Sequence, residues 1–365
     1  MVQELPRRTD RALRLYERYL SPLSLIAGFL LDNLVLLRRV DLWTSNLLLF
    51  FYLALAALGV ALLNLIQTGR LRGGAWLKCA PFLPVVAQFS FGGLFSAYVS
   101  LYSRSAAFAT SWIFVIILAA LLFGNERFTR FYASLTFQIG ILFSVLFSFL
   151  IFYVPVLLGR IGADVFLISG VSALVIMAIF MRLLALPMSE HVRSHRPNIA
   201  RNILAIFAVF NVLYFTNAIP PLPLALKEAG VYHKVQKVGG AYLLQTEPFH
   251  WYEAYLRYNT VFHRAQGQSV YVYSAVFAPT KFSTTILHEW EHYDEKSSAW
   301  VRSATFGFPI TGGRDGGYRG YTLMDNIQEG KWRVNVKTDS GQIIGRISFS
   351  ILDVKERVET QEEMH

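Results

Sequence analysis

The sequence predicts an α-helical membrane domain of about seven transmembrane helices, followed by a small all-β antiparallel sandwich. Hydrophobic residues make up 54% of the 365 positions and charged residues 16%, whereas soluble domains have about 45–50% apolar and about 25% charged residues. Long apolar stretches fill residues 1–226, and short β-like runs fill residues 227–365. We therefore expect a transmembrane domain over 1–226 and a β domain with a charged tail over 227–365.

Seven apolar stretches are long enough to cross a hydrocarbon core, which takes about 20 helical residues. Pro81 and Pro84 interrupt the third of them, and Asp32 and Asn33 lie inside the first. Neighbouring helices can satisfy the backbone groups that such breaks leave free. The predicted spans are 20–37, 42–66, 75–102, 105–123, 131–157, 164–185 and 200–219.

The formal net charge of +10 lies entirely in the apolar part of the chain. Residues 1–226 hold 18 Lys and Arg against 8 Asp and Glu, and residues 227–365 hold 16 of each. A nucleic-acid binder concentrates positive charge on a soluble face, so we expect no nucleic-acid partner. Loops on the N-terminal side of the spans carry fourteen basic residues and the opposite loops carry four. The N-terminus is therefore predicted to be cytoplasmic and the β domain extracytoplasmic, an assignment that reverses if one span is miscounted.

Short runs rich in β-branched and aromatic residues follow Pro220, Pro221 and Pro223, which end the last predicted helix. Gly, Asp, Asn and Ser separate these runs, a spacing that is typical of a small antiparallel sandwich or barrel. The charged tail from Lys355 is expected to fray. The predicted strands are Val231–Val238, Ala241–Gln245, Val270–Phe277, Ala304–Ile310, Trp332–Val336 and Ile343–Ile351.

The string His288-Glu289-Trp290-Glu291-His292 fits the H-E-x-x-H pattern of zinc metallopeptidases. That chemistry needs a helix, which places both imidazoles on one face with the glutamate beside them as general base. On a strand the two histidines lie about 13 Å apart, at about 3.3 Å per residue. The preceding residues 282–287 favour a strand, with Trp290 inward, so a metal at His288 and His292 is the less favoured interpretation.

The string from Gly312 to Thr322 combines glycines with arginines and tyrosines. It lacks the G-K-[ST] of a P-loop. Arg314 and Arg319 offer planar forks for a carboxylate or phosphate, and Tyr318 offers a flat face for stacking. The alternative is a tight connection whose arginines pair with Glu289, Glu291 or Asp315. With Trp290, these three residues form the predicted ligand-binding set.

Polar side chains within the spans are a third group of candidates, because a carboxylate at membrane depth is costly and by default indicates function. Asp32, with Asn33 beside it, is the strongest candidate, although its closeness to Arg38 also fits a place near the membrane interface. Amides such as Asn64 and Gln138 more often join helices.

The C-terminal segment resembles the bacterial domain-of-unknown-function family 2914. The resemblance rests on the tryptophan-bearing string at 288–292, the basic aromatic segment at 312–322, the G-x-W-x-V-x-V motif at 330–336 and the final hairpin at 341–349. It covers residues 270–352 and implies a small β domain that is often attached to membrane spans or other envelope modules. It implies no activity and no catalytic residue, and it favours a strand at the histidine-bearing string.

Together these observations predict a multi-pass protein of the bacterial inner membrane whose periplasmic β domain binds an envelope glycan, a lipid head group or a protein partner. A transporter or flippase using Asp32 and the broken third helix is one alternative. A membrane metalloenzyme using His288, Glu289 and His292 is another. A binding role is favoured over catalysis, and no cofactor is expected. Cys79 is the only cysteine, so neither an intrachain disulfide nor a cysteine metal cluster can form.

Overall fold

The computed structural model describes the chain in two compact units. The described residues are 43–71, 73, 76, 80–105, 112–125, 134–248, 259–265, 267–279, 282–314, 316–355 and 358–365. One unit contains the helices, and the other contains residues 217–365 together with two short segments, 105–112 and 155–163.

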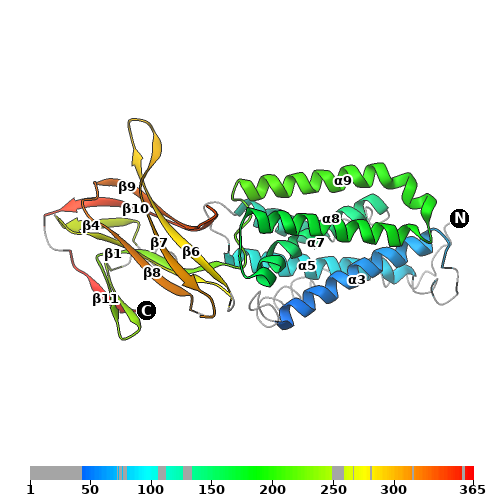
Figure 1. The fold of residues 1–365 in the computed structure, drawn as a ribbon, viewed down its shortest axis with the longest axis horizontal. Helices are drawn as coiled ribbons and strands as arrows, with labels where there is room; N and C mark the ends of the chain where they lie inside the picture. The colour runs from blue at the N-terminus through cyan, green and yellow to red at the C-terminus, as the bar shows by residue number, and fades with distance from the viewer. Residues whose placement is uncertain are drawn as a thin grey trace. The chain divides into compact units, whose positions relative to one another are not determined.

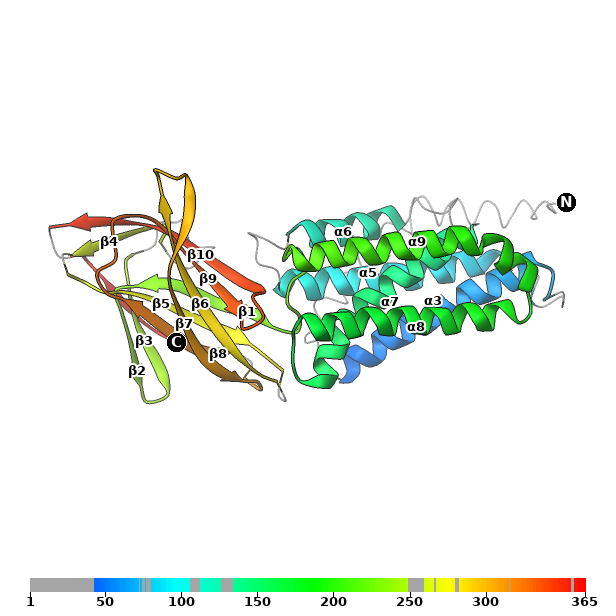
Figure 2. The ribbon, with the colours of Figure 1, turned by 45° about the horizontal axis from the view of Figure 1, so that its top comes forward.

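Six α-helices form within the described part of the helical unit, and Figure 2 shows them running alongside one another. All but α6 are long and apolar enough to cross a membrane. Seven spans were expected. The first, at 20–37, lies outside the described residues, and the described part of the fourth is a helix of only 14 residues. The helices are α3 (Trp43–Gln67), α5 (Leu83–Ser105), α6 (Trp112–Asn125), α7 (Leu135–Leu158), α8 (Ala163–Ala185) and α9 (Ser189–Phe215), with a 3₁₀ turn, η3 (Ala80–Phe82), before α5.

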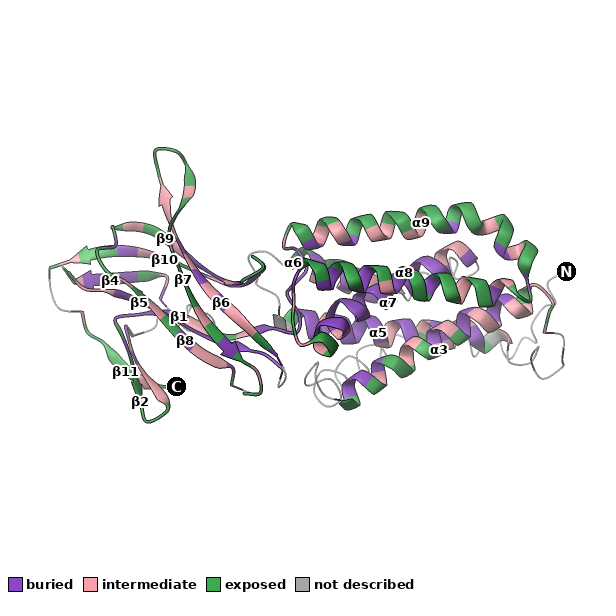
Figure 3. Cartoon of the chain, in the orientation of Figure 1, coloured by how far each residue is buried: buried purple, intermediate pink, exposed green. Residues whose placement is uncertain are grey.

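Helix α7 is the most buried of the five long helices, and buried residues are coloured purple in Figure 3. Tyr98 and Tyr102 on α5 donate hydrogen bonds to two of its carbonyls, those of Val145 and Ser148, at 2.8 Å each. Gly140 leaves room for Asn202 of α9, since a Cβ there would lie 2.3 Å from the amide nitrogen of that side chain. Small residues and tyrosine hydroxyls thus bring neighbouring helices close to α7.

Helix α9 begins eleven residues before the span predicted at 200–219. Its first three turns are polar, and Glu190 lies in the first of them. A helix satisfies its own backbone in water as well as in lipid, so it continues past the apolar stretch. Hydropathy therefore located the apolar part of the element and missed its start.

Eleven strands form three sheets in the described part of the second unit (Figure 1). Their orders are β1-β5-β8, β4-β10-β9-β6-β7 and β11-β3-β2. The strands are β1 (Ala225–Tyr232), β2 (Lys234–Val238), β3 (Ala241–Thr246), β4 (Val261–Ala265), β5 (Val270–Phe277), β6 (Ser283–Asp294), β7 (Ala299–Thr311), β8 (Tyr318–Met324), β9 (Gly330–Thr338), β10 (Ile343–Val354) and β11 (Gln361–Met364).

The β1-β5-β8 sheet is the middle of three layers. Val270, Val272 and Val276 of β5 belong to a large core shared with the five-stranded sheet. Tyr273 and Ala275, on the opposite face of β5, belong to a smaller core shared with the β2 and β3 strands. Successive side chains of a strand point to opposite faces, so β5 serves both cores and is buried along nearly its whole length.

Two features of this region differ from the predicted all-antiparallel sandwich. Strand β4 pairs in parallel with β10, while every other strand pair in the described residues is antiparallel. The tail expected to fray contains β11, which pairs with β3 from Gln361↔Thr246 to Met364↔Leu243. Both pairings join segments far apart in the sequence, so local patterns could not indicate them.

Candidate functional site

The H-E-x-x-H string lies on strand β6, which confirms the strand predicted there. His288 is completely buried, and both of its ring nitrogens are within hydrogen-bonding distance of hydroxyls, Ser274 Oγ at 2.8 Å and Thr322 Oγ1 at 2.9 Å. Burial lowers the pKa of His288 to about 3, so its ring is neutral at ordinary pH. The helix that the zinc interpretation requires is not formed at residues 283–294. His288 instead ties β6 of one sheet to β5 and β8 of another.

The two glutamates of the string point away from this core. Glu291 accepts hydrogen bonds from Arg333 and from Asn335, the latter at 2.7 Å, and Glu289 pairs with Lys337. Burial raises the pKa of Glu291, but the hydrogen bonds from Arg333 and Asn335 outweigh it and the net shift is downward. Both carboxylates therefore belong to a ladder of ion pairs and hydrogen bonds between β6 and β9.

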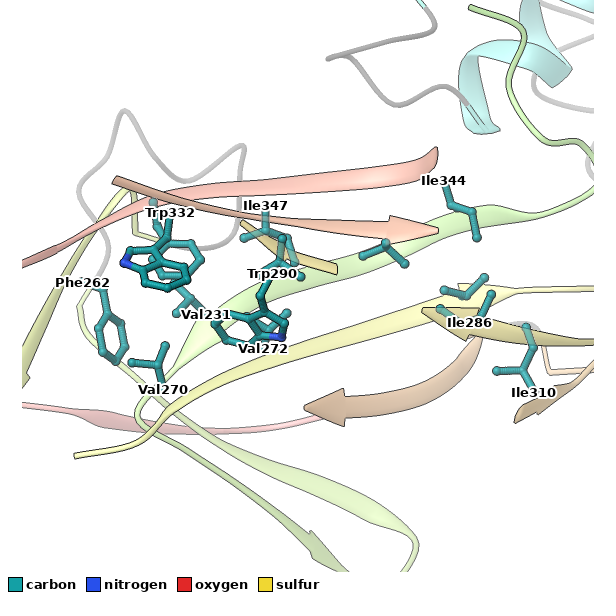
Figure 4. Close-up of a cluster of buried hydrophobic side chains, with 14 of the residues drawn as sticks. Val231, Phe262, Val270, Val272, Ile286, Trp290, Ile310, Trp332, Ile344 and Ile347 are labelled. Atoms are coloured by element: carbon teal, nitrogen blue, oxygen red, sulfur yellow. The ribbon is translucent and has the colours of Figure 1, made fainter. Parts of the chain in front are cut away.

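Trp290 was predicted to be a ligand-site ring, and the structure places it in the hydrophobic core. Its side chain is completely buried, and Figure 4 shows it in the cluster with Val231, Val272 and Ile347. Its indole nitrogen donates to Thr322 Oγ1 at 3.2 Å. An indole ring that other side chains cover on all sides contributes to core packing and exposes no face to a ligand.

The other three predicted ligand-site residues lie together at the start of strand β8. Tyr318 begins the strand, Arg319 follows it, and the Arg314 guanidinium lies 5.5 Å from the centre of the Tyr318 ring. Arg314 is exposed, and Tyr318 and Arg319 are half-buried. Tyr318 and Arg319 are adjacent on β8 and therefore point to opposite faces of the sheet. Because β8 is an edge strand, they border its open edge from the two sides.

Two further tyrosines extend this group. Tyr321 of β8 and Tyr242 of β3 meet edge to face, with ring centres 6.2 Å apart. Burial raises the pKa of Tyr242, and so do Tyr318 and Tyr321, while Arg314 and Arg319 lower it. Both guanidinium groups therefore lie within electrostatic reach of one phenol. We call Arg314, Tyr318, Arg319, Tyr321 and Tyr242 the arginine–tyrosine patch.

The arginines of this patch differ from Arg264 and Arg333 in their partners. Arg264 is paired with Asp353, and Arg333 is paired with Glu291. Arg314 and Arg319 form no ion pair with any residue that the structure describes. The alternative partners Glu289 and Glu291 are bound to Lys337 and Arg333 instead, and Asp315 lies outside the described residues.

The glycines around the patch have a backbone role. A Cβ on Gly312 would lie 1.5 Å from the Pro279 carbonyl oxygen, and Gly317 has a φ of 86°. The amides of Gly312 and Gly313 donate to the carbonyls of Phe282 and Ala278. The glycines therefore let the segment lie directly against another stretch of backbone, which sets where Arg314 and Tyr318 emerge.

Sequence reasoning did not place Tyr242 in this group. It comes from β3, 72 residues before Arg314, and only the packing of β3 against the middle sheet brings it there. Tyr321 carried a local signal, since it shares the Gly-Arg-Tyr string with Tyr318.

The polar residues proposed as candidates in the predicted spans fall into two groups, one outside and one inside the described part of the chain. Asp32 and Asn33 lie outside the described residues. Asn64 of α3 donates to Gln138 Oε1 of α7 at 2.5 Å, and both side chains are completely buried. This pair joins two helices, as predicted for amides within the spans.

These features define a protein with helices long and apolar enough to cross a membrane, joined to a β-rich region with a basic, tyrosine-lined edge. Residues 283–351 match the family model described as a protein of unknown function, DUF2914. The recognised segment therefore runs from the start of β6 into β10, and it includes four of the five residues in the arginine–tyrosine patch.

Comparison with curated proteins gives no match. Among solved structures, the chain shows a likeness to the Pseudomonas fluorescens alkylpurine DNA glycosylase AlkC bound to DNA containing an abasic site analog. The identity is 10%, the TM-score is 0.22, and the match covers 77% of this chain and 83% of that one. A likeness at this level carries no argument about fold or function.

Proposed function

We propose that this is a multi-pass protein of the bacterial inner membrane whose β-rich region, on the periplasmic side, binds an anionic group of an envelope lipid or glycan. One observation carries the proposal. Arg314 and Arg319 lie beside three tyrosines at a sheet edge and have no carboxylate partner in the described residues, while Arg264 and Arg333 are paired. The location rests on the apolar helices and on the excess of basic residues in the loops of one side.

The chemistry of the patch indicates the class of ligand. A guanidinium group presents several donors in a plane that matches phosphate or carboxylate oxygens. Tyrosine rings add flat faces and hydroxyl groups, so a ring or glycerol backbone attached to the anion has a surface to lie on. The shared requirement is a phosphate or carboxylate next to a polar organic group.

Binding of soluble head groups to the full chain tests the proposal. The chain is purified in an uncharged polyoxyethylene detergent and titrated with glycerol 1-phosphate, with a glucuronate oligomer and with glucose. We expect one of the two anions to bind and glucose to have no effect at this patch. Glycerol phosphate binding identifies a lipid head group, and glucuronate binding identifies an acidic glycan.

Two variants and one matched control locate the site. Arg314→Gln and Arg319→Gln should each weaken anion binding about 10-fold or more, since a hydrogen bond to a charged group contributes about 1.5–3 kcal/mol. Arg302→Gln changes an exposed arginine on β7, away from the patch, and should leave binding unchanged. Equal binding by all three variants, or no binding of either anion, would contradict the proposal.

A further inference from the structure

A second polar region of the β-rich unit lies outside the arginine–tyrosine patch. A pocket of about 300 Å³ is bounded by the end of β1, by β3, by the turn after β4 and by the segment before β11. This volume is at the lower end of the range for small-molecule sites. The lining residues are His233, Gln245, Ala265, Gly267, Gln268, Val358 and Thr360.

A buried carboxylate organises the wall of this pocket. Glu247 Oε1 accepts hydrogen bonds from His233 Nε2 at 3.0 Å and from the His263 amide at 2.8 Å, and Oε2 accepts from His263 Nδ1 at 2.7 Å. Burial raises the pKa of Glu247, but the hydrogen bonds from His233 and His263 outweigh it and leave the pKa lowered. With three donors directed at it, this carboxylate is satisfied within the protein.

The same network fixes the hydrogen-bonding groups that line the pocket. Gln268 Oε1 accepts from the Ala265 amide at 3.2 Å, so its nitrogen faces His233 Nδ1 at 2.9 Å. His233 therefore carries its proton on Nε2, toward Glu247, and accepts at Nδ1. Gln268 Nε2 has a second N–H beyond the one directed at His233. His233 itself is buried and its ring stacks on Phe262, with centres 4.3 Å apart.

Two more lining residues bring uncharged polar groups. Gln245 donates through its side-chain amide nitrogen to Glu362 Oε1 at 3.0 Å. The side-chain carbonyl oxygen of Gln245 therefore points away from Glu362. Thr360 adds a hydroxyl, which both donates and accepts. Among the residues that the structure describes, the pocket is thus lined by amides, a hydroxyl and an imidazole, and none of these lining side chains is a carboxylate, lysine or arginine.

We propose that this pocket binds a small uncharged polyhydroxyl ligand, a single sugar unit or a polyol, through Gln245, Gln268 and Thr360. Hydroxyl groups donate and accept at once, so they match a wall of mixed amide donors and acceptors. A charged ligand finds no counter-ion among the described lining residues, because Glu247 is already held by His233 and His263. Gln245 and Tyr242 are three residues apart on β3 and so point to opposite faces, which separates this pocket from the anion-binding patch.

Saturation-transfer NMR on the full chain in polyoxyethylene detergent tests the pocket, with glucose, N-acetylglucosamine, inositol and glucuronate as probes. We expect at least one neutral probe to bind better than glucuronate. Thr360→Val removes only the hydroxyl and Gln245→Met removes the amide at constant length. Each should weaken that binding about 2- to 12-fold, the value of one neutral hydrogen bond.

Two controls separate this proposal from the proposed function. Gln236→Met changes an exposed glutamine of β2 outside the pocket lining and should leave binding unchanged. Arg314→Gln should weaken anion binding alone. The pocket proposal is overturned if no neutral probe binds, if Thr360→Val and Gln245→Met bind as well as the unaltered chain, or if Arg314→Gln abolishes binding of the neutral probe.

Discussion

Buried polar side chains are held differently in the two units of this protein. In the helical unit, Asn64 donates one bond across to Gln138 and one back to the Val60 carbonyl of its own helix, and its oxygen has no partner. In the β-rich unit, Glu247 accepts three hydrogen bonds, and Arg264 donates to both oxygens of Asp353 and to the Ile327 carbonyl. Glu247 and Arg264 therefore have more hydrogen-bond partners in the β-rich unit than Asn64 has in the helical unit.

The difference has a physical cause. A helix satisfies its own backbone, so a single amide bond between helices adds little to what packing already provides. Sheets join segments that are distant in sequence, and polar side chains that cross between strands select one register among several. Mutations of buried polar groups should thus lower the free energy of unfolding more in the β-rich unit than in the helical unit. Three measurements test this ranking.

The largest effect is expected at Arg264, which is paired with the residue directly opposite it in the parallel β4–β10 ladder. Arg264→Ala leaves the Ile327 carbonyl and Asp353 without this donor. Breaking a buried ion pair costs about 3–5 kcal/mol, but the Asp353 side chain is 45% exposed, so we expect about 2–3 kcal/mol. Urea unfolding of the full chain, followed by tryptophan fluorescence, measures the loss. If Arg264→Ala lowers the free energy of unfolding by less than Arg302→Ala on β7 does, the stabilising role assigned to Arg264 is contradicted.

An intermediate effect is expected from the protonation of His288. Its pKa is about 3 in the folded state and about 6.5 when unfolded. The unfolded state therefore binds more protons between these values, and stability is complete above about pH 6.5 and falls as the pH is lowered toward 3. The slope from this group approaches about 1.4 kcal/mol per pH unit, so at pH 5.5 the loss is about 1.4 kcal/mol, between the effects expected at Arg264 and at Asn64.

His288→Leu isolates that contribution. The variant should be less stable at pH 7, because Ser274 and Thr322 lose their partner, and its stability should fall less steeply between pH 4.5 and 6.5. Glu247 and Glu291 have lowered pKa values, so the stability they contribute is lost only below about pH 4.5. Parallel pH profiles for the variant and the unaltered chain would show that His288 is not the titrating group.

The smallest effect is expected at the helix pair. Asn64→Leu removes the bond to Gln138 and also removes an unpartnered oxygen, so the net loss should be about 0.6 kcal/mol, within the range measured for such bonds. Asn211→Leu is the control, because Asn211 donates to Phe207 of its own helix. A loss at Asn64 as large as that at Arg264 would refute the ranking of the two units.

Several elements of this protein could be predicted because their signals are local. Apolar stretches located the long helices, and a run of β-branched and aromatic residues located β5 with both of its boundaries correct. The β-favouring residues 282–287 identified the strand at the H-E-x-x-H string, where the motif alone suggested a helix. Arg314, Tyr318 and Arg319 were found together because they occur within six residues.

Other elements depend on partners that the sequence does not place. Trp290 looks like a binding residue until the β1-β5-β8 sheet covers it, and a buried ring cannot contact a ligand. Strand β4 aligns with β10 through Arg264 and Asp353, which are 89 residues apart.

By itself, the sequence indicated the long apolar helices, most of the strands, and which basic and aromatic residues are adjacent along the chain. Those properties follow from hydropathy and periodicity over a few residues. The tertiary structure decided which faces are covered, which carboxylate pairs with which arginine and that Glu247 lies between two histidines. These depend on contacts across dozens of residues, where many registers share the same local pattern and only packing selects one.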